Sequence, residues 1–169
     1  MAEKLKNLDL EEYLPSQLAT LSNSITRPIA VVFEQRFSIT MPEWRVLAII
    51  GRRPGLSAVD VAYRAQMDKV AVSRAISKLV KSGRIDRSFG SVDRRRSILK
   101  LTEEGRELYE EIAPMALLLE SELLEDLTED EKQFLGRVID KLNSKSRVFA
   151  RPHLTPTNGI RYPSTRMAM

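Results

Sequence analysis

The sequence predicts a mainly α-helical fold with one small β-hairpin, and three observations support that prediction. Apolar residues recur at spacings of three and four over most of the chain, which is typical of amphipathic helices. Capping signatures that open helices occur at Thr40, Ser57 and Thr128. Only between Ile85 and Leu101 does the apolar period change towards two, as it does in strands.

Residues 1–40 predict an N-terminal dimerisation helix region. One side of the expected helix carries an apolar stripe, made of Leu18, Leu21, Ile25, Ile29, Val32 and Phe33. Pro28 lies inside this stripe and should kink or interrupt the helix. The stripe is either ordinary core or the seam of a dimer. A helix this apolar near a chain end usually needs a partner, which a second copy would provide.

Residues 41–101 predict a lobe of short helices followed by a hairpin. The helices should begin at three capping residues, Thr40, Ser57 and Asp68. Two helices joined by a tight turn and followed by a strand hairpin form a winged helix-turn-helix. We therefore expect a recognition helix over residues 68–82 and a wing over residues 85–101, flanked on both sides by further helices.

The predicted recognition helix has two chemically different faces. Its inward face is apolar and consists of Val72, Ala75, Ile76, Leu79 and Val80. Its outward face is small and basic and consists of Lys69, Val70, Ser73, Arg74, Ser77, Lys78 and Lys81. Such a ridge suits the major groove of DNA, where an arginine can bind guanine through O6 and N7. Lys69 also lies near the helix N-terminus, where free backbone amides and the helix dipole favour a phosphate.

Positive charge is concentrated in the same part of the chain. Residues 51–100 hold 13 Lys and Arg against 4 Asp and Glu, a net charge of +9, whereas residues 101–145 carry a net charge of −8. The loop between the two expected strands ends in Arg94, Arg95 and Arg96. A cationic hairpin tip suits the narrower and more negative minor groove. One face of the protein is therefore expected to meet a polyanion.

Residues 102–148 predict two C-terminal helices, and residues 149–169 predict an extended or disordered basic tail. Thr102 should cap a long helix that Pro114 bends, and Thr128 should open the final helix. The tail has three prolines and no apolar periodicity. It is either a free end or an arm that wraps the partner subunit or touches DNA.

Three motifs occur together at a specific spacing. They are Asp68-Lys69-Val70-Ala71-Val72-Ser73-Arg74, Asp93-Arg94-Arg95-Arg96 and Leu101-Thr102-Glu103-Glu104-Gly105. Over about residues 18–148 the chain resembles the multiple-antibiotic-resistance regulator (MarR) family. The resemblance implies an obligate homodimer with one winged helix per subunit. By the same resemblance, the helices of residues 1–40 and 102–148 are N- and C-terminal dimerisation helices that interleave between the subunits. It also implies binding to palindromic double-stranded DNA operators, mostly as a repressor.

The resemblance further implies which side chains touch DNA. Ser73 and Arg74 match base-reading positions, Lys69 and Lys78 match groove or phosphate positions, and Arg95 is the wing arginine. Asp93 would orient Arg95. The complete predicted DNA-contact set is Ser57, Lys69, Val70, Ser73, Arg74, Lys78, Asp93, Arg94, Arg95 and Arg96.

Many proteins of this family release DNA when a small phenolic or carboxylated effector binds, which implies an effector pocket. An aromatic wall beside a guanidinium suits an aromatic carboxylate or its thioester. The candidates are Arg27, Phe33, Trp44 and Arg45, although Trp44 is equally suited to the core. The chain has no cysteine, so it does not resemble the peroxide-sensing branch, and it lacks the histidines of the zinc-sensing branch.

Two other classes of function compete with this interpretation. A winged-helix module for protein–protein interaction is the main alternative, but it does not need a net charge of +9. An enzyme is not expected, because there is no cysteine and a single histidine, His153, which also argues against a metal or cofactor site. No apolar run reaches the length of a membrane span and no signal peptide is visible, so we expect a cytoplasmic protein. Whether the regulator represses or activates stays open, because that depends on where the operator lies.

Overall fold

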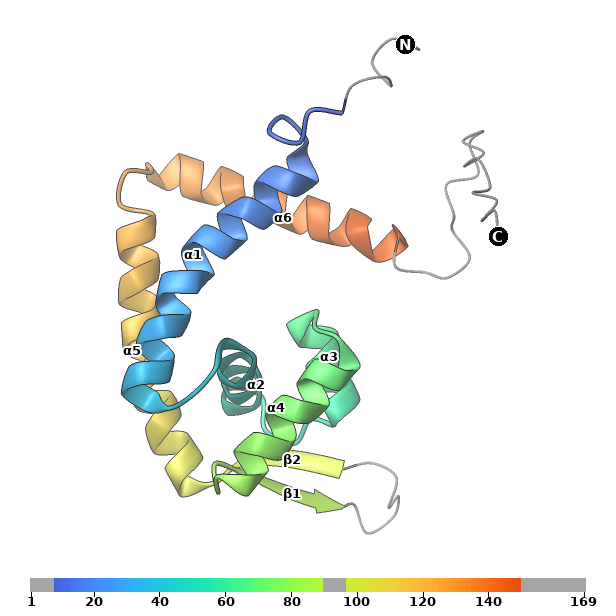
Figure 1. Ribbon diagram of the computed structural model, residues 1–169, viewed down its shortest axis with the longest axis vertical. Coiled ribbons are helices and arrows are strands. Elements are labelled where there is room, and N and C mark those ends of the chain that lie inside the picture. The colour runs from blue at the N-terminus through green and yellow to red at the C-terminus, as the bar shows by residue number, and fades with distance from the viewer. Residues whose placement is uncertain (1–7, 90–96, 150–169) are drawn as a thin grey trace, which may run out of the picture. The chain divides into compact units, whose positions relative to one another are not determined.

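The computed structural model describes residues 8–89 and 97–149, and it confirms a mainly helical fold with one hairpin (Figure 1). The chain separates into two compact units, residues 1–116 and residues 117–169. The elements are α1 (Leu14–Phe37), α2 (Met41–Arg52), α3 (Ala58–Ala65), α4 (Lys69–Lys81), β1 (Ile85–Phe89), β2 (Ser97–Leu101), α5 (Glu103–Leu123) and α6 (Glu129–Phe149). The first unit holds α1 to β2 and most of α5, and the second holds the end of α5 and α6.

Two helices contain a proline and are nevertheless continuous. Pro28 lies inside α1 and Pro114 lies inside α5. Of the two effects predicted for Pro28, an interruption therefore does not occur. The end of α1 is set instead by Ser38, which has a left-handed backbone (φ 50°) and donates its N–H to the carbonyl of Glu34 at 3.1 Å.

The core of the first unit joins α2, α3, α4 and the hairpin. Its most buried side chains are Val46, Leu47, Ile50, Val61, Val72, Leu79, Ile85 and Leu99. The predicted inward face of α4 is confirmed for four of its five members, but Val80 is 38% exposed. At about 100° per residue, Val80 lies about 80° around the helix from Val72, at the margin of the buried arc. The packing of α2 and α3 against α4 does not extend that far.

The turn between α3 and α4 follows the expected helix-turn-helix geometry. Gln66 ends α3 with a left-handed backbone (φ 50°), and Asp68 then caps α4. The Asp68 carboxylate accepts the backbone N–H of Val70 at 2.8 Å and that of Ala71 at 3.2 Å. The three-residue connection fixes α4 as the second helix of the motif.

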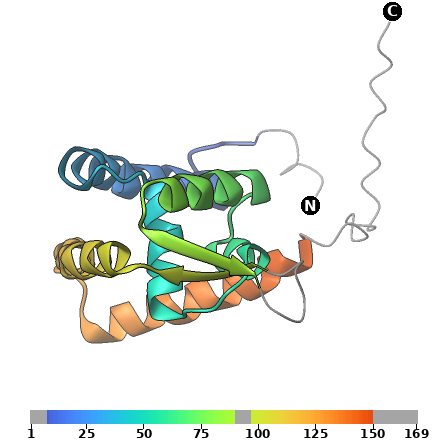
Figure 2. The ribbon, with the colours of Figure 1, turned by 90° about the horizontal axis from the view of Figure 1, so that it is seen from below.

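The hairpin has the predicted bounds and an additional contact. Its antiparallel register pairs Ile85 with Leu101 and Phe89 with Ser97. Leu56, in the loop after α2, forms an isolated antiparallel β-bridge with Leu99 of β2. The hairpin lies beside α4 at the edge of the unit, in front in the view of Figure 2.

The junction between β2 and α5 explains the Leu-Thr-x-x-Gly pattern at residues 101–105. The Thr102 hydroxyl donates to the carbonyl of Gly83 at 2.6 Å and accepts the N–H of Gly105 at 3.0 Å. A Cβ on Gly105 would lie 1.9 Å from the carbonyl oxygen of Arg84. Only glycine therefore lets the first turn of α5 pack directly on the turn between α4 and β1.

The second unit is built on α6, whose N-terminus is closed by the predicted capping box. The Glu131 carboxylate accepts the backbone N–H of Thr128 at 2.8 Å and its hydroxyl at 2.7 Å. These two hydrogen bonds hold the pKa of Glu131 below its ordinary value. Four large apolar side chains of α6 are exposed, namely Phe134, Leu135, Ile139 and Leu142. Within the ranges 8–89 and 97–149, no helix is both long and apolar enough to cross a membrane.

Candidate nucleic-acid interface

The outward face of α4 forms an exposed ridge on the first unit. Because Val72, Ala75, Ile76 and Leu79 are buried against the lobe, the opposite side of the helix points away from it. All seven residues predicted for this face are exposed, namely Lys69, Val70, Ser73, Arg74, Ser77, Lys78 and Lys81. Val70 is 56% exposed, so the ridge also carries an apolar contact suited to a thymine methyl group.

The N-terminus of α4 differs from the expectation that its amides are free. The Asp68 carboxylate occupies the N–H groups of Val70 and Ala71. It also places a negative charge where a phosphate was expected. With these two amides occupied, the helix end contributes less to phosphate binding than the sequence suggested, and the Lys69 side chain contributes more.

Arg74 lies in the middle of the ridge and is exposed. In the part of the chain that the structure describes, its guanidinium has no hydrogen-bond or ion-pair partner. One turn further along α4, Lys78 is engaged: its Nζ lies 3.2 Å from Oε1 of Glu43. Glu43 belongs to the capping signature that begins at Thr40, and nothing in the sequence links it to a lysine 35 positions later.

Ser57 caps α3 rather than presenting a free hydroxyl. Its Oγ donates to the Asp60 carboxylate at 2.6 Å, and it accepts the Asp60 N–H at 3.2 Å. The proton that would reach a phosphate is thus used inside the lobe. Contact between Ser57 and DNA stays a prediction. A phosphate would have to compete with the Asp60 carboxylate for the Ser57 hydroxyl.

The predicted wing contacts lie outside the described residues. These are Asp93, Arg94, Arg95 and Arg96, and the tail from residue 150, with His153, falls outside them as well. The strands that flank the loop are described, and their register brings Phe89 and Ser97 opposite one another. The assignment of the wing to DNA therefore stays a prediction.

The candidate effector residues are only partly brought together. The Phe33 ring is 1% exposed and packs edge-on against Trp44, with 5.6 Å between ring centroids. Trp44 stacks on Tyr109 of α5 at 6.0 Å, an aromatic neighbour that the sequence did not reveal. Arg27 and Arg45 are exposed. Phe33 thus belongs to the core between α1 and α2, and its ring is not open to a ligand.

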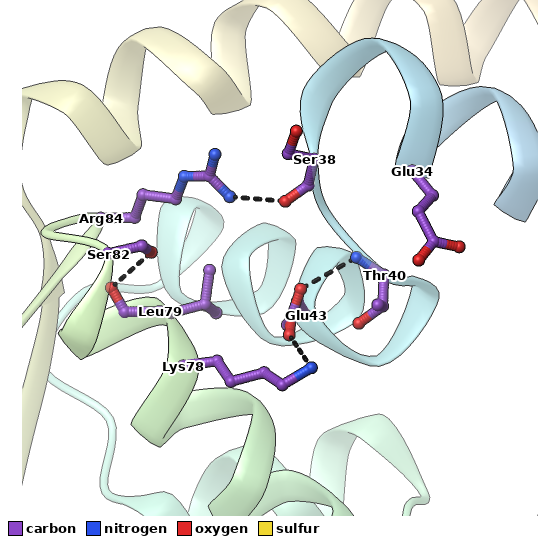
Figure 3. Close-up of a pocket in the computed structure, with 8 residues that line it drawn as sticks. All are labelled: Glu34, Ser38, Thr40, Glu43, Lys78, Leu79, Ser82 and Arg84. Carbon is purple, nitrogen blue, oxygen red and sulfur yellow. Dashed lines mark hydrogen bonds and ion pairs between the residues drawn. The ribbon is translucent and has the colours of Figure 1, made fainter.

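A polar cavity of about 410 Å³ lies at the junction of α1, α2 and α4 (Figure 3). Its walls are formed by Glu34, Ser38, Thr40, Glu43, Lys78, Leu79, Ser82 and Arg84, none of which is a predicted effector residue. The Arg84 guanidinium donates to the carbonyls of Ser38 at 3.1 Å and Phe37 at 3.2 Å, which ties the end of α1 to the end of α4. Among the described residues, no cluster of three His, Cys, Asp or Glu could hold a metal ion.

A helix-turn-helix with a hairpin and an exposed basic recognition helix defines a winged-helix protein of the nucleic-acid-binding type. A sequence profile of the MarR family matches residues 37–96. A MarR/EmrR family transcriptional regulator from Acinetobacter sp. ADP1 has the same fold, with a TM-score of 0.78 and 31% identity, covering 83% of this chain and 99% of that chain. The chain belongs to the MarR family.

Two curated relatives are similar over shorter stretches. The HTH-type transcriptional regulator BilQ of Clostridium symbiosum is 31% identical over 93 residues, covering 55% of this chain and 65% of BilQ. The homoprotocatechuate degradative operon repressor of Escherichia coli is 29% identical over 86 residues, covering 51% of this chain and 55% of the repressor. The chain thus spans between about half and two thirds of the length of each of these two relatives. These relatives are named as regulators and not as enzymes.

Proposed function

We propose that the chain is a dimeric, sequence-specific DNA-binding transcriptional regulator, acting in the cytoplasm and most simply as a repressor. The observation that carries the proposal is the α4 ridge: a fully packed inner face holds an outer face on which Arg74 is exposed and free of any described partner. The names of the relatives, including one repressor, favour this function over a protein–protein interaction module.

The proposed contacts on α4 have separate roles. Arg74 and Ser73 read base edges in the major groove, with Val70 beside them for a thymine methyl group. Lys69 contacts a phosphate, which adds affinity without sequence information. The wing residues Arg94, Arg95 and Arg96, oriented by Asp93, would extend the contact into the flanking minor groove. Two such lobes related by a dimer axis would read a palindrome with half-sites about 10 bp apart.

A small effector is also part of the proposal. One relative is named as the repressor of a degradative operon for homoprotocatechuate, an aromatic acid. In this chain Trp44 and Arg45 lie next to one another at the start of α2, and Trp44 is stacked on Tyr109. We assign the aromatic wall to Trp44, with Arg27 and Arg45 as the cations that meet a carboxylate. Phe33 supports Trp44 from within the core.

The test of base reading is Arg74→Ala. An arginine bidentate to guanine contributes about 1–3 kcal/mol of discrimination, so the preference for operator over random DNA should fall by about fivefold to 150-fold per half-site. Titrations of both duplexes at one salt concentration measure the ratio. The matched control is Arg106→Ala, which removes an exposed arginine from α5 of the same unit, where it pairs with Glu103. An equal effect of the two changes would contradict the assignment of α4.

The operator and the effector are found together by a footprint on the DNA that flanks the gene. We expect a two-fold symmetric protected site that one compound in a panel of aromatic acids and thioesters removes. A protected site without two-fold symmetry would contradict the proposal that the chain binds DNA as a dimer. A protected site that no compound removes would contradict the proposal that a small effector releases the DNA. Absence of protection at low salt would favour the protein–protein interaction module instead.

A further inference from the structure

One basic member of the predicted DNA-contact set forms an ion pair within the protein itself. Among the members that the structure describes, only Lys78 forms an ion pair, with its Nζ 3.2 Å from Oε1 of Glu43. The Lys78 side chain is 68% exposed, whereas that of Glu43 is 8% exposed. The lysine therefore reaches from the outer ridge of α4 to a carboxylate fixed inside the lobe, as Figure 3 shows.

Glu43 is held in place independently of the lysine. Its second oxygen, Oε2, accepts the backbone N–H of Thr40 at 2.9 Å, which closes the capping box of α2. Its position in the first turn of α2 also places the negative charge at the positive end of the helix dipole. A buried carboxylate that loses its counter-ion is left uncompensated, which is costlier than breaking a surface pair. Lys78 is therefore retained at Glu43 more firmly than its exposure suggests.

We propose that Glu43 is a positioning residue that withholds Lys78 from DNA phosphates and thereby limits the sequence-independent part of DNA binding. This inference rests on the proposed function. A phosphate contact raises the affinity for every sequence alike, through release of the counterions that surround DNA. A lysine that is paired with Glu43 contacts no phosphate and therefore releases no counterions from the DNA. The free charge of the ridge is then carried by Lys69, Arg74 and Lys81.

The test is Glu43→Gln, which removes the charge and keeps an oxygen for the Thr40 N–H, since glutamine serves equally in a capping box. With Lys78 released, each subunit gains one phosphate contact. The slope of log affinity against log salt should steepen by about 0.9 per subunit, or about 1.8 per dimer. Between 50 and 200 mM salt, the affinity should therefore fall by about tenfold more than for the unaltered protein. The change should be the same on operator and random duplexes, because phosphates carry no sequence information.

A matched control separates release of Lys78 from a general change in charge. Glu34→Gln removes the same charge from the same cavity, and Glu34 is exposed with no ion-pair partner among the described residues. It should leave the slope unaltered. The double variant Glu43→Gln/Lys78→Gln should return the slope to its original value, and Lys78→Gln alone should not change it.

Three outcomes would overturn the inference. The first is an equal slope for Glu43→Gln and Glu34→Gln. The second is a slope that becomes shallower by about 0.9 per subunit in Lys78→Gln alone, because Lys78 would then already contact a phosphate. This second measurement decides the matter even if Glu43→Gln does not fold, which thermal melts of each variant reveal. The third is an unaltered protein that binds no duplex at low salt, which overturns the proposed function and this inference with it.

Discussion

The helices α1 and α4 carry similar apolar patterns but use them differently. In α4 the apolar face is buried within its own lobe, with Val72 and Leu79 each 1% exposed. In α1 the same spacing leaves Leu18, Leu21 and Val32 exposed, and only Phe33 and Phe37 near its end are buried. Apolar residues at spacings of three and four therefore establish that one face of a helix is apolar, but they do not show what covers that face. The α4 face is covered by the chain's own helices, whereas the α1 face is open and fits the proposed second copy.

The largest expected effect comes from placing a charge on the α1 stripe. Leu21→Glu should convert the proposed dimer to monomer. Each dimer loses two buried leucines at about 1.5–3 kcal/mol apiece, so the dissociation constant should rise by about a hundredfold to ten-thousandfold. Sedimentation over a concentration series measures this shift. The control is Asn23→Glu, which adds the same charge on the exposed polar side of α1. Equal dissociation constants for the two variants would show that this stripe is not the seam.

The second prediction concerns the α4 face, which should respond in folding rather than in association. Leu79→Ala should lower the free energy of unfolding by about 2–5 kcal/mol, because it opens a cavity in a closed core. Val70→Ala, on the exposed side of the same helix, should change it by at most about 0.5 kcal/mol. Urea denaturation at one fixed protein concentration compares the two. Equal losses would mean that α4 is not anchored through this face.

The same contrast explains what the sequence could predict. Three kinds of feature follow from local patterns and were predicted correctly: the hairpin between residues 85 and 101, the exposed ridge of α4, and the caps at Ser57, Asp68, Thr102 and Thr128. Each depends on residues a few positions apart, within reach of one turn or one hairpin.

Features that depend on distant residues were not predictable in this way. Three such features join segments that are far apart in the chain. They are the ion pair of Glu43 with Lys78, the stacking of Trp44 on Tyr109, and the hydrogen bonds from Arg84 to the carbonyls at the end of α1. The free amides expected beside Lys69 were wrong for a different reason. The same Asp68 that was correctly predicted to cap the helix uses those amides, so the two expectations excluded one another.

A comparison of two capping boxes gives the smallest and most local prediction. Thr40 and Glu43 begin α2 inside the lobe, where Glu43 also has Lys78 as a counter-ion. Thr128 and Glu131 form the same box at the start of α6, where Glu131 is fully exposed. The start of α2 is thus supported by the core and a cation, whereas the start of α6 depends on its own hydrogen bonds.

The pKa of Glu131 should therefore report the α6 cap directly. Its hydrogen bonds with the Thr128 backbone and hydroxyl lower the pKa in the folded protein. A carboxyl with a lowered pKa stabilises the folded state above its unfolded pKa, and this contribution is lost as the pH falls through the lowered value. Thr128→Ala removes the hydroxyl bond, so an NMR titration should show the Glu131 pKa rising part of the way to its ordinary value. The backbone bond should hold the remainder of the shift. The acid-induced loss of α6 helicity should move to higher pH with it, and an unmoved pKa would show that the box is not formed in solution.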